Sequence, residues 1–473
     1  MQEIIDLTTA IANWFWGIPI LVLIGGGGLY LSIRCGFVQI RKFGYICRET
    51  FGKMFKKAEE GQITPFAAAC SALGSSIGAS NIVGVPVAIA LGGPGAVFWM
   101  WLIAIVGCCT KYCEIALAVK YKEKDETGTW FGGAFSYIKE AFGIKQIGII
   151  AGTIFALCGA INCLPSCASQ ILSATAQIGA FDGNETVFGF IIIAFVTTVV
   201  FGGIKRIAVV MEKTVPIMAI IYLVGVLAIL VMNYDRIIPS LVNIVKYAFT
   251  SHAAFGGFTG STIALAMRWG IARGVYSNKA GYGTAAIAHS ASDVDHPIRQ
   301  AIWGVFEVGV DTLLVCTATA LAVLTTGVWT KEGIDSGALG QAAFGTAFGK
   351  FGEIFVAICV LLFVITTIIV VIYYGEKNMQ FVFKTAKADI VWRCVILAAM
   401  VFALFGMELT IAYQFIDFFG ALKIIPNMLA LIWLAPQVVE LNKEYFNTPG
   451  KYYLADIAEK RAKKEAQKAA RGK

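Results

Sequence analysis

Long apolar runs alternate with short polar segments along almost the whole chain. A helix needs roughly 20 consecutive apolar residues to cross a bilayer, so runs of this length predict membrane spans. The pattern predicts about eleven transmembrane helices, at 14–33, 65–91, 95–119, 147–177, 186–204, 214–233, 253–275, 300–326, 351–375, 390–407 and 411–435. We therefore expect an all-α polytopic membrane protein.

The second predicted span contains residues that a stable membrane helix avoids. Its stretch GSSIGASNIVG, residues 74–84, combines glycines with polar side chains. Lipid cannot satisfy freed backbone groups, so a break here must face protein or a water-filled cavity. Close helix packing would explain the glycines and serines but does not require Asn81. We expect a break within residues 75–82 and a solute site beside it. The candidate substrate contacts are Ser75, Gly78, Ala79, Ser80 and Asn81.

After the first span, the remaining spans divide into two sets of five, at about 65–233 and 237–435. The second set also opens with a glycine-interrupted stretch, FGGFTGSTIALAMRWG at 255–270, which makes Gly257, Thr259 and Gly260 candidate substrate contacts. Paired interrupted helices predict a transporter built from an inverted repeat, although the halves share no residue-level similarity. The expected units are an extra N-terminal transmembrane helix with a basic loop (1–62), the five-plus-five core (63–440) and a basic tail (441–473).

Composition agrees with a membrane protein and charge sets its orientation. Hydrophobic residues make up 58% of the chain, charged residues 14%, and the mean hydropathy is +0.74. Lys and Arg cluster at 34–57, 120–124, 205–206, 377–387 and 443–473. The positive-inside bias places these segments in the cytoplasm, with the N-terminus outside and the C-terminus inside a cell inner (plasma) membrane. The net charge of +8 is therefore a signal of topology, and nucleic-acid binding is not needed to explain it.

Ionisable residues inside spans are rare and are hypotheses of function by default. Glu114, Glu307 and Asp311 fall in spans, and Arg268 and Arg273 are their expected partners at the same depth. A packing or gating salt-bridge network is a better interpretation of this set than ion coordination.

Thr366 and Thr367 lie in the middle of an apolar span. Their hydroxyls could bond back to carbonyls of their own helix. They could equally donate oxygens to a sodium ion, together with carbonyls near Ile77 and Gly78 at the predicted break. Sodium, as a coupling ion, is the only metal that we expect, and no other cofactor is predicted.

Catalysis is poorly supported by the sequence. The three histidines, His252, His289 and His296, fall in expected loops or helix ends, and no nucleophile–base spacing appears. The twelve cysteines show no spacing typical of metal ligands or disulfides. We expect a transporter and not an enzyme.

Several long stretches resemble the alanine/glycine:cation symporter family. They are LGGPGAVFWMW (91–101), KYCEIALAVKY (111–121), FGGIKRIAVVMEKTVP (201–216), GIARGVYSNKAGYGTAAIAHSA (270–291), DTLLVCTATA (311–320) and YYGE (373–376). The resemblance covers about residues 60–440. It implies a leucine-transporter-type core and uptake of a small neutral amino acid driven by sodium, or in some members by protons.

The chain also departs from that family's pattern. Where the family has a glutamine, the match falls on Pro165, and Val371 and Ile372 replace a tryptophan and a serine. These replacements predict a larger and more apolar pocket than one for alanine. Lys279 reverses a charge, and Lys423 replaces an apolar residue. The alternative is therefore a transporter of the same fold with a changed solute class or coupling ion, in which Lys423 stands in for a cation.

Overall fold

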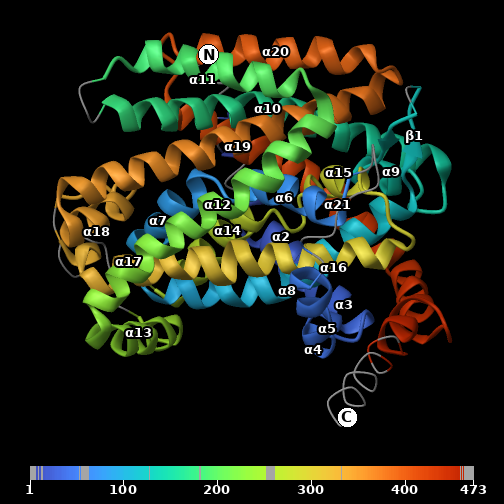
Figure 1. Cartoon of the computed structure of the whole chain (residues 1–473), viewed down its shortest axis with the longest axis horizontal. Helices are drawn as coiled ribbons and strands as arrows, with labels where there is room; N and C mark the ends of the chain where they lie inside the picture. Colours follow the sequence, from blue (N-terminus) through green and yellow to red (C-terminus); the bar gives the residue numbers. More distant parts are fainter. Residues whose placement is uncertain are drawn as a thin grey trace, which may run out of the picture.

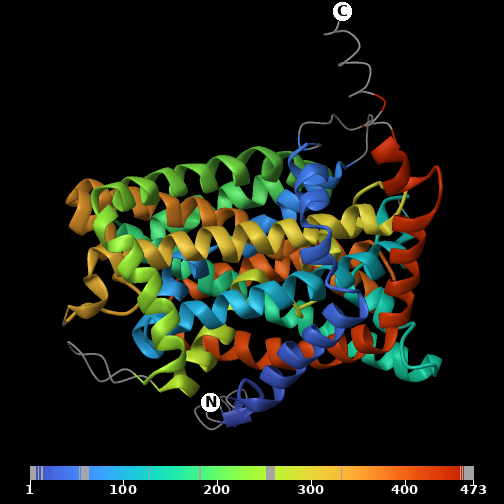
Figure 2. The ribbon, with the colours of Figure 1, turned by 90° about the horizontal axis from the view of Figure 1, so that it is seen from below.

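The computed structural model of the chain is almost entirely helical (Figure 1). It describes residues 7–462 apart from 9, 12, 13, 53, 55–62, 127, 180–182, 252–261, 332, 459 and 461. Long helices run side by side along one direction of the molecule (Figures 1 and 2), as expected of spans that cross a membrane.

The N-terminal part and the first set of core helices have these bounds: α2 Ile18–Leu21, η1 Val22–Gly26, α3 Gly27–Arg34, α4 Val38–Arg41, α5 Phe43–Phe51, α6 Pro65–Ser76, η2 Ser80–Gly84, α7 Val85–Gly92, α8 Gly95–Lys120, β1 Glu123–Lys124, β2 Trp130–Phe131, α9 Ala134–Ile138, α10 Lys145–Gly179, α11 Glu185–Val200 and α12 Gly203–Met232. The two short strands β1 and β2 pair antiparallel.

The second set follows with η3 Tyr234–Arg236, α13 Ile237–Phe249, α14 Ile263–Asn278, α15 Ala285–Ser290, α16 Pro297–Val308, η4 Gly309–Cys316, α17 Thr317–Thr326, η5 Val328–Thr330, α18 Leu339–Phe348, α19 Lys350–Phe383, α20 Lys387–Ala403 and α21 Leu409–Asn447. The elements η1, η2 and η4 are π-helical, and η3 and η5 are 3₁₀ turns.

Length and apolar composition identify the spans. In the described part of the chain, six helices are long and apolar enough to cross a membrane. A seventh span is the pair Pro65–Ser76 and Ser80–Gly92, which is bent by 51°. Ile18–Arg34 and Glu185–Val200 are shorter apolar helices. These elements are consistent with the eleven spans that the hydrophobic pattern predicts.

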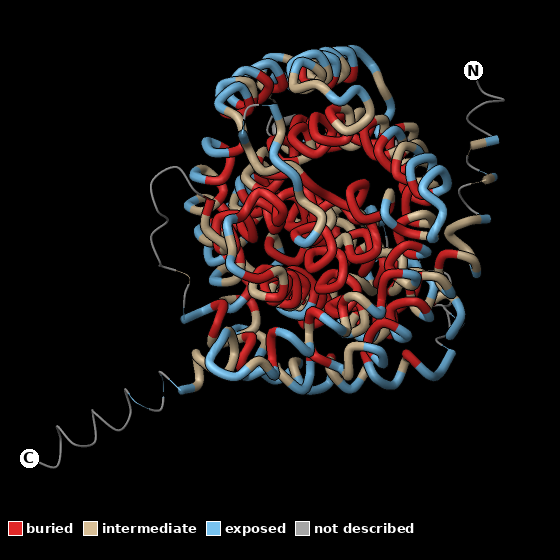
Figure 3. The backbone as a smooth tube through the Cα atoms, turned by 90° about the vertical axis from the view of Figure 1, so that its right-hand side faces the viewer, coloured by how far each residue is buried: buried red, intermediate tan, exposed pale blue. Residues whose placement is uncertain are grey.

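Helix packing places a buried core at the centre of the molecule (Figure 3). The long helix α10 packs against α19 and α21, while α8 packs against α14 and α16. Outward-facing apolar side chains cover the exterior, and on α12 they recur at helical spacing. This lipid-type face of α12 comprises Ile217, Ile220, Val224, Leu227 and Val231.

The basic segments meet at one end of the molecule. The Tyr45 hydroxyl on α5 lies 2.8 Å from that of Tyr445 on α21, and Lys120 at the end of α8 donates to Gln437 on α21. Helices α13 and α18 lie at the opposite end (Figures 1 and 2). The end with α5, β1–β2 and the end of α21 is called the basic end below.

The first helix break lies where the sequence predicts it. Helix α6 ends at Ser76, and Ile77 is extended, with φ −75° and ψ 93°, before the chain turns helical again at η2. No residue of this break has a positive φ. The prediction of a break within 75–82 is confirmed.

The second described break differs from the predicted one. The glycine-rich stretch before α14 falls largely in 252–261, outside the described residues, and α14 itself runs unbroken from Ile263. The break follows Asn278, where Lys279, Gly281 and Gly283 have φ values of 58°, 89° and 69°. Three left-handed positions within five residues cannot continue a right-handed helix, so the chain turns here before α15.

Candidate functional site

A small internal cavity lies between the two helix breaks. Its volume is about 40 Å³, and its walls come from both breaks and from α10, α14, α19 and α21. The lining residues are Ser75, Gly78, Ser80, Asn162, Cys163, Ser166, Gln170, Tyr276, Lys279, Tyr282, Thr284, Thr367, Val371, Tyr374, Ile416 and Lys423. Paired breaks at a shared cavity are how many secondary transporters bind solutes and ions.

The first break is held by the Asn81 side chain. Asn81 Oδ1 accepts the Gly78 N–H at 3.0 Å, which satisfies a backbone donor freed by the break. Asn81 Nδ2 donates to Asp311 Oδ1 at 2.8 Å and to Ser277 Oγ at 3.1 Å. Asp311 lies in the π-helical η4, and its other oxygen accepts the hydroxyls of Ser277 and Thr312. A carboxylate from the second set of helices therefore fixes the break in the first.

The second break is held directly by a carboxylate of the first set. Glu114 on α8 accepts the N–H groups of Gly281 and Gly283, each at 3.0 Å to Oε1. The same oxygen accepts Asn427 Nδ2 of α21 at 2.8 Å, and Asn427 also donates to the Gly281 carbonyl. Both backbone donors are buried, so Glu114 supplies the partner that the missing helix turn does not.

A third buried carboxylate, Glu307 on α16, joins several elements. It accepts Lys111 Nζ at 2.8 Å and Ser76 Oγ at 3.0 Å, and it lies 3.1 Å from His289 Nε2. His289 is contacted in turn by Gln300. Neither Lys111, His289 nor Glu307 is exposed, so charge pairing compensates for the burial of the charged groups.

The two adjacent threonines of α19 point to different surroundings. Thr367 Oγ1 donates to the Gly74 carbonyl of α6 at 3.0 Å and lines the cavity beside Gly78. Thr366 Oγ1 instead contacts carbonyls of its own helix, with Phe363 O at 2.9 Å. Back-bonding therefore describes Thr366, while Thr367 lies against the break, although it also contacts Phe363 O at 2.8 Å.

Four of the substrate contacts predicted from the sequence line the cavity, namely Ser75, Gly78, Ser80 and Val371. Ala79, Asn81 and Pro165 are buried outside its lining, and Pro165 lies within the continuous helix α10. Of the predicted sodium ligands, Gly78 and Thr367 line the cavity, whereas Ile77 and Thr366 do not. Gly257, Thr259 and Gly260 lie outside the described residues.

Other expected contacts have different partners in the structure. Arg268 and Arg273 were expected to pair with the buried carboxylates, but both guanidinium groups lie over the ring of Trp269. The partners of the buried carboxylates are instead backbone amides, Lys111 and Asn81. The cysteine spacing gave no sign that the thiols of Cys35, Cys109 and Cys113 would lie together, yet all three sulfurs are within 4.8 Å of one another. Cys35 follows α3, whereas Cys109 and Cys113 lie on α8, and spacing in the sequence cannot reveal that these segments meet.

Sequence reasoning did not assign several lining residues to the site. Tyr276 lies just before the second break, Tyr282 lies within it, and Gln170 lies one to two turns beyond Pro165 on α10. The signal that could have found part of this set was the pair of unexpected lysines. Lys279 and Lys423 both line the cavity.

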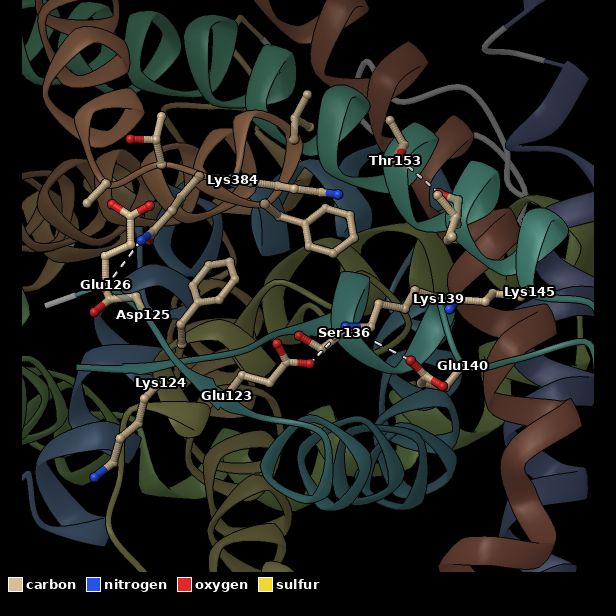
Figure 4. A pocket seen from close by; sticks show the side chains of 17 residues that line it. Glu123, Lys124, Asp125, Glu126, Ser136, Lys139, Glu140, Lys145, Thr153 and Lys384 are labelled. Atoms are coloured by element: carbon tan, nitrogen blue, oxygen red, sulfur yellow. Dashed lines mark hydrogen bonds and ion pairs between the residues drawn. The ribbon is translucent and has the colours of Figure 1, made fainter. Parts of the chain in front are cut away.

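A larger pocket of about 510 Å³ lies away from the breaks, beside the β1–β2 hairpin at the basic end (Figure 4). Acidic and basic side chains are mixed around it, and some pair with each other, as Lys139 does with Glu123 at 2.8 Å. Both breaks reach the smaller cavity, and two buried carboxylates hold those breaks. We therefore place the candidate site there.

Comparison with known proteins gives relatives over nearly the whole chain. The chain is 41% identical over 468 residues to an uncharacterized transporter, YflA, of Bacillus subtilis, covering 98% of each chain. It is 34% identical to the sodium/alanine symporter AgcS of Methanococcus maripaludis, covering 94% of this chain and 98% of that protein. It is also 34% identical to the probable sodium/glutamine symporter GlnT of Bacillus subtilis, covering 94% and 91%.

Solved structures support the fold. MhsT in complex with L-phenylalanine matches with a TM-score of 0.55 at 14% identity, covering 81% of this chain and 99% of that one. A Na⁺-coupled sialic acid symporter matches with a TM-score of 0.54 at 10% identity, covering 89% and 98%. The fold is that of the leucine-transporter type. The model of the sodium:alanine symporter family matches residues 1–455, and this chain therefore belongs to the sodium:alanine symporter family.

Proposed function

We propose that the chain is a secondary active symporter that imports an amino acid together with sodium by alternating access. The observation that carries this proposal is the cavity between the two breaks. At the first break, the carboxyl end of α6 meets the amino end of the helical segment Ser80–Gly92. Opposed helix ends offer partial negative and positive charge to the amine and carboxylate that all amino acids share.

The coupling ion is proposed to bind at Thr367. This hydroxyl lies against the Gly74 carbonyl, and Gly78 lines the same cavity. Hydroxyl and carbonyl oxygens are ligands that hard cations prefer. Thr366 is left out of this site because it does not line the cavity, and its hydroxyl has no contact with the first break. Proton coupling is the alternative, and it requires no oxygen cage of this kind.

The basic end is proposed to face the cytoplasm, with the N-terminus outside and the C-terminus inside. The Lys- and Arg-rich segments gather there, as the contacts of α5 and α8 with α21 indicate. The positive-inside bias then sets the orientation. Proteolysis of sealed cells, or labelling of a thiol introduced into the basic tail 443–473, would test it, and access only after permeabilisation is the expected result.

The departures from the family pattern led to the prediction of a larger neutral amino acid. Only one of the three replaced positions, Val371, lines the cavity, since Pro165 and Ile372 lie outside the lining. Support for apolar selectivity therefore rests on Val371 alone. Val371→Trp would fill this part of the wall, so a preference set by apolar volume should shift toward alanine and glycine in that variant.

Uptake into proteoliposomes containing the purified full-length protein tests the function. A panel of labelled amino acids would be measured with an inward sodium gradient, with a proton gradient and with neither. We expect saturable uptake that depends on sodium. No saturable uptake of any amino acid would contradict the proposed function, and uptake driven by protons alone would contradict the sodium coupling.

A further inference from the structure

Two lysines on separate elements line the same small cavity. Lys279 lies in the second break, and Lys423 lies on α21 with 3% of its surface exposed. No Asp or Glu is among the residues that line the cavity. The wall of the candidate site therefore carries basic side chains and no acidic ones.

The lysines have weak polar contacts in the structure. Lys423 Nζ lies 3.4 Å from Asn162 Oδ1 and 4.8 Å from the ring centroid of Tyr282. Lys279 Nζ lies 3.9 Å from the ring centroid of Tyr276 and 5.4 Å from that of Tyr282. Within the described part of the chain, neither ammonium group forms an ion pair with a carboxylate.

The carboxylates near the breaks are committed elsewhere. Glu114 accepts the second break's amides, and Asp311 accepts Asn81, as described above. Asp417 on α21 is near two cationic side chains, Arg273 and Lys279, and it does not line the cavity. Two lysine side chains thus face one cavity that no carboxylate of the described residues lines.

Buried charges are costly unless they are paired, and intramembrane charges are commonly part of a solute or ion pathway. An anionic group in the cavity would supply the missing partner. We propose that the substrate is an acidic amino acid, whose side-chain carboxylate binds between Lys279 and Lys423. This rests on the proposed function and replaces the neutral side chain predicted from the sequence.

The lysines lie apart from the segment that would bind the α-amino and α-carboxyl groups common to all amino acids. The first break reaches the cavity at Gly78 and Ser80, whereas the lysines come from the second break and α21. The α-amino and α-carboxyl groups would bind at the first break, and the side chain would extend toward the lysines. A charged hydrogen bond of this kind is stronger than one to a neutral amide.

Each acidic amino acid can be compared with its amide, which has nearly the same shape but no side-chain charge. Glutamate and glutamine, and aspartate and asparagine, would compete against the labelled amino acid that the uptake panel identifies, in proteoliposomes of the full-length protein under an inward sodium gradient. We expect the acid to compete better than its amide by roughly ten- to a hundredfold in both pairs. Alanine and leucine would be included to represent small and larger neutral side chains.

Lysine variants then test which residues carry the preference. Lys423→Met and Lys279→Met keep most of the side-chain volume and remove the charge, and each should reduce the acid-to-amide ratio by about tenfold or more. Lys423→Arg should keep the ratio above one. Lys350→Met, an exposed position at the start of α19, is the matched control and should leave the ratio unchanged.

Thermal unfolding of the purified protein with glutamate or glutamine provides a second readout that does not need transport by the variants. Stabilisation by glutamate that is lost in Lys423→Met would support the proposal. It is overturned if amides or apolar amino acids compete as well as acids while sodium-dependent uptake persists. It is also overturned if uptake of neutral amino acids becomes sodium-dependent only in the methionine variants, because the lysines would then replace the coupling cation. Absence of all amino-acid uptake would instead contradict the proposed function.

Discussion

The two helix breaks solve the same problem with different chemistry. The first contains one extended residue, Ile77, and uses the Asn81 side chain to cap a freed amide. The second uses three left-handed residues, and the Glu114 carboxylate binds its amides without an intermediary. One break is therefore held through a relay of side chains, and the other by a direct contact with the backbone.

The two carboxylates that hold the breaks come from opposite sets of helices. Glu114 lies on α8, the helix that follows the first broken span, and it holds the second break. Asp311 lies in η4, within the span that follows the second broken helix, and it holds the first break through Asn81. Each set of five thus supplies, from its second span, the group that fixes the break of the other. This reciprocal arrangement agrees with the five-plus-five repeat.

The largest effect is expected from removing the direct contact. Glu114→Ala leaves two backbone N–H groups and the Asn427 amide without an acceptor, and each buried unsatisfied donor costs about 1–3 kcal/mol. We expect a marked fall in thermal stability and loss of uptake. Glu114→Gln keeps an acceptor oxygen and should lose much less. Equal losses in both variants would mean that the charge, and not the hydrogen bonding, holds the break.

Removing Asp311, which holds the first break through Asn81, should have a smaller effect on stability. Asp311→Ala removes the acceptor of Asn81, Ser277 and Thr312, but the two hydroxyls can rotate toward other acceptors. We expect a loss of roughly 1–3 kcal/mol in the free energy of unfolding, below that of Glu114→Ala, measured in the same detergent. A larger loss than for Glu114→Ala would reverse the comparison.

Alanine at a glycine of each break should sharpen the contrast. At Gly283, φ is +69° and a Cβ atom would lie 2.6 Å from that of Ala134, so Gly283→Ala should cost about 1–3 kcal/mol of stability. At Gly78, the nearest atom to a new Cβ is Thr367 Oγ1 at 2.9 Å, and φ is not positive. Gly78→Ala should therefore affect uptake more than thermal stability. Both variants would be measured by unfolding and by transport.

The smallest effects on stability are expected at the threonines of α19. There the two variants are compared by the sodium dependence of uptake. Thr367→Val removes a hydroxyl at the first break, and we expect the sodium concentration for half-maximal uptake to rise by about tenfold. Thr366→Val removes a hydroxyl that bonds within its helix, and we expect a change within about twofold. Unchanged sodium dependence in Thr367→Val would refute the proposed ion site.

The sequence could reveal the first break and not the second for a physical reason. Glycines beside polar residues in an apolar run are visible as a pattern, and Gly78 and Asn81 carried that signal. In the second break, Gly281 and Gly283 stand among Tyr and Ala residues, and what breaks the helix is their left-handed backbone. A backbone conformation of this kind is set by tertiary contacts, here those of Glu114.

Among the site residues too, those marked by a local pattern could be predicted and those fixed by long-range contacts could not. Ser75, Gly78 and Val371 could be predicted, because local pattern or family departures marked them. Asn81 was selected for its polarity, but whether a buried amide faces a cavity or a carboxylate depends on a residue 230 positions away, Asp311. Long-range pairing of this kind leaves no trace in local periodicity.

The volume of the cavity has a consequence for every affinity measured on this protein. At about 40 Å³, the space is a few times the roughly 10–15 Å³ that one water molecule needs, and it is well below the roughly 150 Å³ of a cavity that admits benzene. The conformation that binds substrate must therefore be a wider member of the ensemble. The observed dissociation constant then equals the intrinsic one divided by the population of that wider state. A modest apparent affinity is therefore compatible with tight binding in the wider state, and a substitution far from the cavity changes the apparent affinity if it changes the population of that state.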